Sequence, residues 1–241
     1  MEREKKNLTL SGSGSAPGGV YEDVRINGSG KIHGNIVCDH IDINGSGRVL
    51  GDVKASSVTI SGSAVVEKTM IAESVVVNGS FKVEGDFTGE RIEVNGHTKI
   101  LGALHSEGLR VNGILTVAGA LEAEELTAEG QLTVGGLCSA ERIDITLSGL
   151  TSRVKEFGCG TLTVHRRLSS SLFGPLLSVF RMGNLIVDTI EGDDLYLEDT
   201  EAQIVRGNRV RIGPGCTIGK VTYQSDYEKD EKATVQSAVK E

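Results

Sequence analysis

Apolar and polar residues alternate along the chain inside a unit that repeats every 17 residues. Seven consecutive segments share this pattern without an insertion, and they begin at Val24, Ile41, Val58, Val75, Ile92, Leu109 and Leu126. Alternation with period two predicts β-strands that bury one face. A fixed period repeated this often predicts a repeat architecture rather than an ordinary globular domain.

Glycine and apolar residues occupy the same positions in every segment. The fifth position is Gly28, Gly45, Gly62, Gly79, Gly96, Gly113 and Gly130. The third, ninth and thirteenth positions are apolar, apart from small Ala128 and Cys138, and the fifteenth is small in all seven segments. We expect the glycines to mark corners, where they supply backbone angles that other residues reach only with strain.

Two β-architectures produce such a pattern. Asn-Gly pairs such as Asn27–Gly28 are a strong hairpin signal, so a meander of hairpins is the first alternative. Arms of three residues are too short to pair stably, and a meander does not need identical residues at identical positions. A solenoid does need them, because each coil lies about 4.8 Å above the previous one and like residues stack. The repeat therefore predicts an all-β solenoid of parallel strands.

The repeats predict five regions. Residues 1–22 are expected to be a flexible tail, 23–165 the β-helix core and 166–184 an apolar excursion. Residues 185–223 are expected to add coils after the excursion, and 224–241 to form a disordered, charged tail.

Composition and charge exclude several functions. The net charge of −8 disfavours nucleic acid as a partner. Cys38, Cys138, Cys159 and Cys216 form no C-x-x-C pair, so no metal and no redox motif is indicated. No signal peptide and no apolar run of about 20 residues is present, so we expect a cytoplasmic protein with reduced thiols. No phosphate-binding loop or catalytic cluster stands out, so neither a cofactor nor an enzyme is expected.

Tandem V-x-I-N-G-x-x-x-V-x-G repeats over about residues 18–142 resemble the bactofilins, a class of polymer-forming bacterial cytoskeletal proteins. The stretch 188–223 is also similar to the C-terminal part of longer bactofilins. The resemblance implies a right-handed β-helix that polymerises without nucleotide into non-polar filaments through hydrophobic end coils. It further implies a scaffold at the inner face of the membrane for cell shape, cell-wall enzymes or motility. The chain departs from the common pattern by continuing beyond the repeats and by lacking an apolar N-terminal peptide.

The physics of a solenoid also favours polymerisation. Each open end is an unpaired strand edge above exposed core, which is a template for another end. We expect the contact to use apolar residues of the end coils, namely Val24, Ile26 and Ile32 at the first end and Ile212, Ile218 and Val221 at the last. The expected partner is another copy of the chain, and co-assembly with a related bactofilin stays open. In the alternative, Leu8–Leu10 or Val20–Tyr21 folds over the first end, and a capped solenoid then acts as a protein-binding module.

An apolar run with basic flanks is the candidate for peripheral membrane or partner contact. It contains Leu172, Phe173, Leu176, Leu177 and Phe180, between Arg166–Arg167 and Arg181. The alternative is a loop or short helix packed on the flank of the β-helix, because Gly174–Pro175 argues against a continuous helix.

Two further patterns have simple alternatives. Glu73, Glu90, Glu107, Glu124 and Glu141 share the sixteenth position and predict an acidic stripe, which could hold cations or a basic partner or could be only a solvated corner. The segment 212–219 resembles the hexapeptide rhythm of left-handed β-helix acyltransferases. Such enzymes need a histidine as general base, and His165 lies on a different segment, so this is the rival function.

Overall fold

The computed structural model describes residues 6–167 and 183–241, and every regular element in these two ranges is a β-strand. The strands pair in parallel and wind into coils of about 17 residues, so the predicted all-β solenoid is confirmed. The chain divides into two compact units, Met1–Ala120 and Leu121–Glu241, here called the N-terminal unit and the C-terminal unit.

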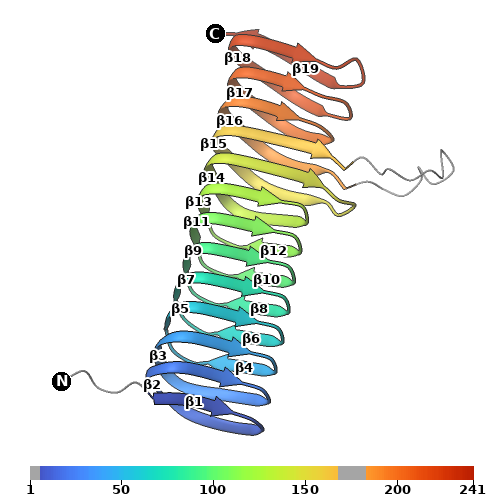
Figure 1. Ribbon diagram of the computed structural model, residues 1–241. Coiled ribbons are helices and arrows are strands. Elements are labelled where there is room, and N and C mark those ends of the chain that lie inside the picture. Colours follow the sequence, from blue (N-terminus) through green and yellow to red (C-terminus); the bar gives the residue numbers. More distant parts are fainter. Residues whose placement is uncertain (1–5, 168–182) are drawn as a thin grey trace, which may run out of the picture. The chain divides into compact units, whose positions relative to one another are not determined.

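The N-terminal unit is built from long strands and four-residue strands that alternate after β3. Its strands are β1 (Lys6–Leu10), β2 (Ser13–Ile26), β3 (Ser29–Ile43), β4 (Ser46–Val49), β5 (Val53–Ile60), β6 (Ser63–Val66), β7 (Met70–Val77), β8 (Ser80–Val83), β9 (Phe87–Val94), β10 (His97–Ile100), β11 (Leu104–Val111) and β12 (Ile114–Val117). Figure 1 shows β4, β6, β8, β10 and β12 as one stack and β5, β7, β9 and β11 as another.

Like repeat positions pair between neighbouring coils of this unit. Val53 lies beside Met70, and Met70 beside Phe87, with no slip in the register. The rows predicted to be apolar are buried: Ile60 and Phe87, for example, are both 0% exposed. The small residues of the fifteenth position, such as Ala72 at 3% exposure, are buried as well, apart from the half-buried Ser106. Stacked apolar rows thus form one core that no single coil could build.

The corner glycines are needed for a reason that differs from the expected one. Among the described glycines, only Gly34, Gly149 and Gly215 have a positive φ, so the fifth-position glycines do not require left-handed backbone. A Cβ on Gly45 would instead overlap the carbonyl oxygen of Gly28, one coil earlier, and one on Gly79 would overlap that of Gly62. The expectation of special backbone angles was therefore wrong for the fifth-position glycines. Glycine recurs there because the backbones of neighbouring coils approach too closely for a Cβ.

Asparagines before these glycines form a ladder instead of hairpin turns. The Asn95 side-chain amide donates to Oδ1 of Asn78 at 3.0 Å, and that of Asn112 donates to Asn95 at 2.8 Å. Asn44 donates to Asn27 in the same way at 3.3 Å. Each ladder bond joins neighbouring coils, so the Asn-Gly pairs stabilise stacking and agree with rejection of the hairpin meander.

The C-terminal unit has longer, continuous strands. They are β13 (Leu121–Ala128), β14 (Gln131–Leu147), β15 (Ser152–Arg166), β16 (Leu185–Leu197), β17 (Thr200–Ile212), β18 (Thr217–Lys229) and β19 (Thr234–Lys240). The pairing of Leu185 with Thr200 shows that one coil here has only 15 residues. Its core rows contain Phe157, Ile190 and Val205, all 0% exposed.

Regular structure extends into both segments that were expected to be tails. β1 and most of β2 lie within residues 1–22, and β18 runs to Lys229 before β19 begins. Leu8 pairs with Val24 and Leu10 with Ile26, an offset of 16 that continues the repeat with one residue missing. At the other end Val235 pairs with Ile218 and Ala238 with Val221, so the charged tail keeps enough of the repeat to add a strand.

Candidate assembly surfaces

Strand β1 covers the first end of the N-terminal unit. Among the described residues it pairs with β2 alone, so its outer edge has no described partner. Leu8 and Leu10 are half-buried, and Leu10 lies over Gly30, where a Cβ would stand 2.8 Å from Leu10 Cδ1. A glycine at this inward position lets the leucine settle on the core. The two leucines form the outermost apolar layer of the unit.

The first coil has a thinner core than the coils that follow it. Its register places Gly19 beside Ile36, at a position where other coils bury a large side chain. The Tyr21 ring fills this space, since a Cβ on Gly19 would lie 3.5 Å from Tyr21 Cε2. The Tyr21 hydroxyl donates to the Pro17 carbonyl oxygen at 2.9 Å, which fixes the ring. The first end is therefore partly covered by a leucine pair and one aromatic ring.

The predicted first-end residues lie one coil further in. Val24, Ile26 and Ile32 are 1%, 0% and 0% exposed. Leu8, Leu10 and Ala16 are their strand partners on the outer side. The pairing of β1 with β2 thus agrees with the alternative in which Leu8–Leu10 folds over this end. The sequence signal for this strand is Leu8-Thr9-Leu10-Ser11-Gly12, which repeats the pattern of Val24–Gly28. Its spacing is 16 residues, so a search for a strict 17-residue repeat misses it.

The predicted last-end residues are also covered. Ile212, Ile218 and Val221 are 2%, 0% and 0% exposed, and the latter two lie beneath β19. The outermost apolar side chains are instead Val235, which is half-buried, and Val239, which is 46% exposed. The signal for strand β19 was the recurrence of Val235 and Ala238 one repeat after Ile218 and Val221, which the surrounding charges obscured.

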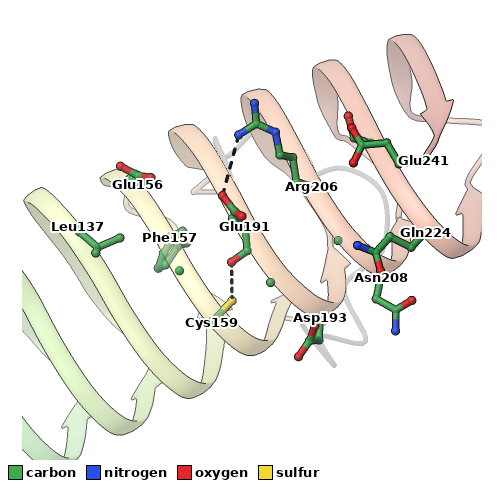
Figure 2. Close-up of a pocket in the computed structure, with 14 residues that line it drawn as sticks. Leu137, Glu156, Phe157, Cys159, Glu191, Asp193, Arg206, Asn208, Gln224 and Glu241 are labelled. Atoms are coloured by element: carbon green, nitrogen blue, oxygen red, sulfur yellow. Dashed lines mark hydrogen bonds and ion pairs between the residues drawn. The ribbon is translucent and has the colours of Figure 1, made fainter.

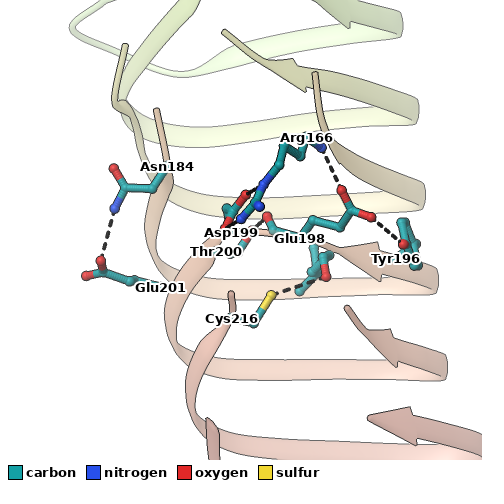
Figure 3. A network of polar contacts seen from close by, with 9 residues as sticks. Arg166, Asn184, Tyr196, Glu198, Asp199, Thr200, Glu201 and Cys216 are labelled. Atoms are coloured by element: carbon teal, nitrogen blue, oxygen red, sulfur yellow. Dashed lines mark hydrogen bonds and ion pairs between the residues drawn. The ribbon is translucent and has the colours of Figure 1, made fainter. Parts of the chain in front are cut away.

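The candidate membrane or partner residues Leu172, Phe173, Leu176, Leu177 and Phe180 lie outside the described residues. The two strand ends that flank that segment are held by a polar network (Figure 3). Arg166, at the end of β15, forms a two-pronged ion pair with Asp199, and its backbone N–H donates to Glu198 at 2.7 Å. On the other flank, Asn184 accepts from the Thr151 hydroxyl at 2.8 Å and donates to Glu201 at 2.9 Å.

The same network perturbs two titratable groups. The Tyr196 hydroxyl donates to Glu198 at 2.6 Å, which raises the pKa of Tyr196 to about 12. The hydrogen bond to Asp199 raises the pKa of the Arg166 guanidinium. Asp199 has a positive φ of 43°, and its carboxylate occupies the space where Gly215 would carry a Cβ. The network therefore fastens the turns around Asp199 and Gly215 to the end of β15.

A hollow of about 470 Å³ lies on the C-terminal unit (Figure 2). Its lining includes Gly158, Gly192 and Gly207 and carries more carboxylates than cations. Arg206 lies 3.9 Å from Glu191, and the Cys159 thiol donates to the Glu191 carbonyl oxygen at 3.6 Å. Burial, with nearby Asp193 and Glu141, raises the pKa of Cys159 to about 12, so this thiol stays protonated at neutral pH.

The histidine and the segment named for the rival acyltransferase function both lie in the C-terminal unit. The His165 ring packs on Tyr196 with centroids 5.3 Å apart, and residues 213–216 of the segment 212–219 form the turn between β17 and β18. In the ranges 6–167 and 183–241, no group of three or more His, Cys, Asp or Glu side chains is arranged to hold a metal. Within the same ranges no helix is long and apolar enough to cross a membrane.

Comparison with known proteins agrees with this architecture. Residues 4–87 match the family model Bactofilin, described as polymer-forming cytoskeletal. Uncharacterized protein YhbF of Bacillus subtilis (strain 168) is 44% identical over 98 residues, which is 41% of this chain and 39% of that protein. Uncharacterized protein YhbE of the same organism is 38% identical over 99 residues, or 41% of this chain and 40% of that protein. The chain thus spans about two fifths of the length of these relatives.

No solved structure matches the chain at a significant level. The family match covers β1 to the end of β8, the part in which the strict repeat begins. The predicted resemblance is therefore confirmed for residues 4–87, which match the Bactofilin family model.

Proposed function

We propose that the chain is a non-enzymatic cytoskeletal scaffold that assembles end to end, without nucleotide, into filaments. The observation that carries the proposal is the pair of outer strands, β1 and β19. Neither has a described strand on its outer edge, so each offers unpaired N–H and C=O groups beside apolar side chains. The family's description as polymer-forming cytoskeletal supports the same reading.

The contact is proposed to use the outermost residues rather than the residues expected from the repeat alone. Leu8 and Leu10 supply the apolar layer at the first end, and Val235 and Val239 supply it at the last. Val24, Ile26, Ile32, Ile212, Ile218 and Val221 support these layers from beneath. Complete burial of a leucine side chain stabilises a contact by about 1.5–3 kcal/mol, so two leucines matter for assembly.

The test is negative-stain microscopy and sedimentation of the purified chain without nucleotide, with the variant Leu8→Lys/Leu10→Lys beside it. A charge at these positions would be buried in an end contact, so the variant is expected to stay dispersed. Thr9→Lys is the matched control, because Thr9 lies on the same strand and is exposed. Full-length filaments in the double variant, with normal circular dichroism, would contradict the proposed contact.

The cellular setting is a further part of the proposal. By family resemblance, the filament lies peripherally at the inner face of the membrane and supports cell shape, cell-wall organisation or motility. Leu172, Phe173, Leu176, Leu177 and Phe180 are the proposed membrane or partner contact. Removal of 168–182 is expected to abolish co-sedimentation with liposomes while filaments persist. Undiminished liposome binding by a folded deletion variant would exclude this contact.

A further inference from the structure

Two charged ladders run along the N-terminal unit with the same spacing. The basic ladder lies on the short strands, where the register aligns Lys31, Arg48, Val65, Lys82 and Lys99 in one row. The acidic ladder lies at the bend in the middle of the eight-residue strands, where Glu73, Glu90 and Glu107 follow one another in successive coils. All three glutamates are exposed, as are Lys31, Arg48 and Lys99.

Two side chains of the basic ladder form ion pairs with glutamates of the same unit. Arg48 lies 2.5 Å from Glu67, and Lys82 lies 2.6 Å from Glu84. Lys99 forms no ion pair with a described residue, and the same holds for Glu90 and Glu107 within residues 6–167 and 183–241. Lys99, Glu90 and Glu107 are thus charges of both signs on one unit that form no ion pair with each other.

The two ladders match in two successive coils. Lys82 and Glu90 belong to one coil, and Lys99 and Glu107 belong to the next, with the same separation in sequence. A second copy lying parallel and level would bring its Glu90 to Lys82 and its Glu107 to Lys99. The match does not extend to the two preceding coils, where Arg48 is followed at the same separation by Ser56 and Val65 by Glu73.

We propose that these ladders form a lateral docking surface for a second copy of the chain. The basic ladder of one copy lies along the acidic ladder of its neighbour, with Lys82 paired to Glu90 and Lys99 to Glu107. The proposal rests on the proposed function, because filaments of this chain would bring copies side by side. The contact joins two different patches, so one copy keeps its acidic ladder free, the other keeps its basic ladder free, and both can recruit further neighbours.

Repetition along a filament makes the contact effective. One exposed ion pair stabilises little, so two free copies would separate readily. Filaments present the same pairs at every subunit, and the second and later contacts then form within an assembly that is already held together. Salt screens exposed charges over about 8 Å at physiological ionic strength, so bundles should separate as salt rises.

An anionic lipid surface fits the basic ladder less well. Glu67 and Glu84 lie directly beside Arg48 and Lys82, where lipid phosphates would have to approach. These carboxylates would repel such a surface, and the chain as a whole carries a charge of −8. A row of carboxylates on a second copy repeats at the same coil spacing as the lysines, whereas lipid phosphates have no such fixed spacing.

The first experiment compares bundle width by negative-stain microscopy at about 50 mM salt. The variants are Lys82→Glu/Lys99→Glu, Glu90→Lys/Glu107→Lys, and an equal mixture of the two. Each variant alone is expected to lose lateral bundling, and the mixture to recover it, because unlike ladders then meet again. Arg25→Glu/Arg110→Glu is the matched control, since it changes the charge equally at exposed sites in another row. Equal bundling in all variants would overturn the proposal.

The second experiment does not depend on filaments. Isotopically light and heavy chains are mixed, joined with a zero-length carbodiimide and analysed by mass spectrometry. Mixed-isotope links from Lys82 to Glu90 and from Lys99 to Glu107 are expected, with loss of at least tenfold in the charge-reversal variants. If such links appear without filaments, lateral docking stands and the proposed function fails. Absence of the links overturns lateral docking. Binding of the chain to phosphatidylglycerol vesicles that depends on Lys99, observed while the links are absent, overturns it as well.

Discussion

Asp199 and Arg166 are joined by two hydrogen bonds although they stand 33 positions apart in the sequence. Both guanidinium donors, Nε and Nη2, reach the two oxygens of one carboxylate. The Asp199 side chain is 14% exposed, and its backbone is held in the left-handed region. A fork of this kind combines charge with fixed geometry, so it anchors the turn before β17 to the end of β15.

Asp199→Asn is expected to lower the free energy of unfolding by about 1–2 kcal/mol, because the neutral amide keeps the volume and the backbone preference but loses the ion pair. Urea unfolding followed by circular dichroism measures the change. Asp194→Asn is the matched control, because Asp194 forms the same two-pronged pair with Arg209 at a more exposed site. Equal destabilisation by the two variants would contradict the role assigned to burial.

Gly79→Ala is expected to destabilise the N-terminal unit by at least about 2 kcal/mol, because the new Cβ would overlap the Gly62 carbonyl oxygen. Gly12 occupies the same repeat position in the first coil, and a Cβ there would meet nothing within 4 Å. Gly12→Ala should therefore be tolerated. Thermal unfolding of the two variants checks the pair, and similar melting temperatures would show that backbone approach does not select glycine here.

Thr98→Val is expected to stabilise the protein by about 1 kcal/mol, since the Thr98 hydroxyl is buried without a hydrogen-bond partner and valine has nearly the same shape. Ser152 gives the opposite case, because its buried hydroxyl accepts a hydrogen bond from the Leu132 backbone N–H at 3.1 Å. Ser152→Ala should accordingly destabilise. Chemical denaturation would contradict this account if both substitutions changed stability in the same direction.

Stability is expected to fall above about pH 9. Burial raises the pKa of Cys216 to about 11 and that of Cys159 to about 12, from an ordinary thiol value of 9.0. Between pH 9 and these values the unfolded chain loses thiol protons that the folded chain keeps, so the folded state binds more protons and the free energy of unfolding decreases as pH rises. Each thiol contributes up to about 1.4 kcal/mol per pH unit in that window.

The melting temperature measured from pH 7 to pH 11 tests this linkage. Cys159→Ala/Cys216→Ala should flatten the alkaline decline relative to the parent chain, whatever its effect at pH 7. Thiol-reactive dye at pH 8 provides a second readout, with slow labelling in the folded state and fast labelling in urea. Rapid labelling of Cys159 in the folded protein would show that its thiol is accessible and ionised.

The strict repeat made much of the fold predictable. Ile60 and Phe87 could be assigned to the core because a solenoid stacks equal positions, and one residue pattern repeated seven times leaves little freedom of register. The outer strands were harder to predict for a physical reason. The coil that begins at Leu8 lacks one residue and carries Gly19 in place of a core side chain, so its pattern is weak although its backbone still pairs.

The sequence predicted the type of candidate surface but not the residues that form it. An apolar end layer was expected, but the residues that form it are Leu8 and Leu10, one coil beyond Val24. The pair of Arg166 with Asp199 could not be predicted, because it joins strands whose spacing is broken by the segment between them. The acidic ladder was expected from the sixteenth position of the repeat, whereas the basic ladder became evident only from the register of the short strands.

Fibre diffraction from aligned assemblies of the chain, prepared without nucleotide, tests the central claim most directly. Coils stacked along a filament place strands perpendicular to its axis, which predicts a strong reflection at about 4.7–4.9 Å along the fibre direction. The same spacing found only across the fibre, or a chain that remains dispersed at high concentration and aligns into no fibre, would contradict end-to-end stacking of the solenoid.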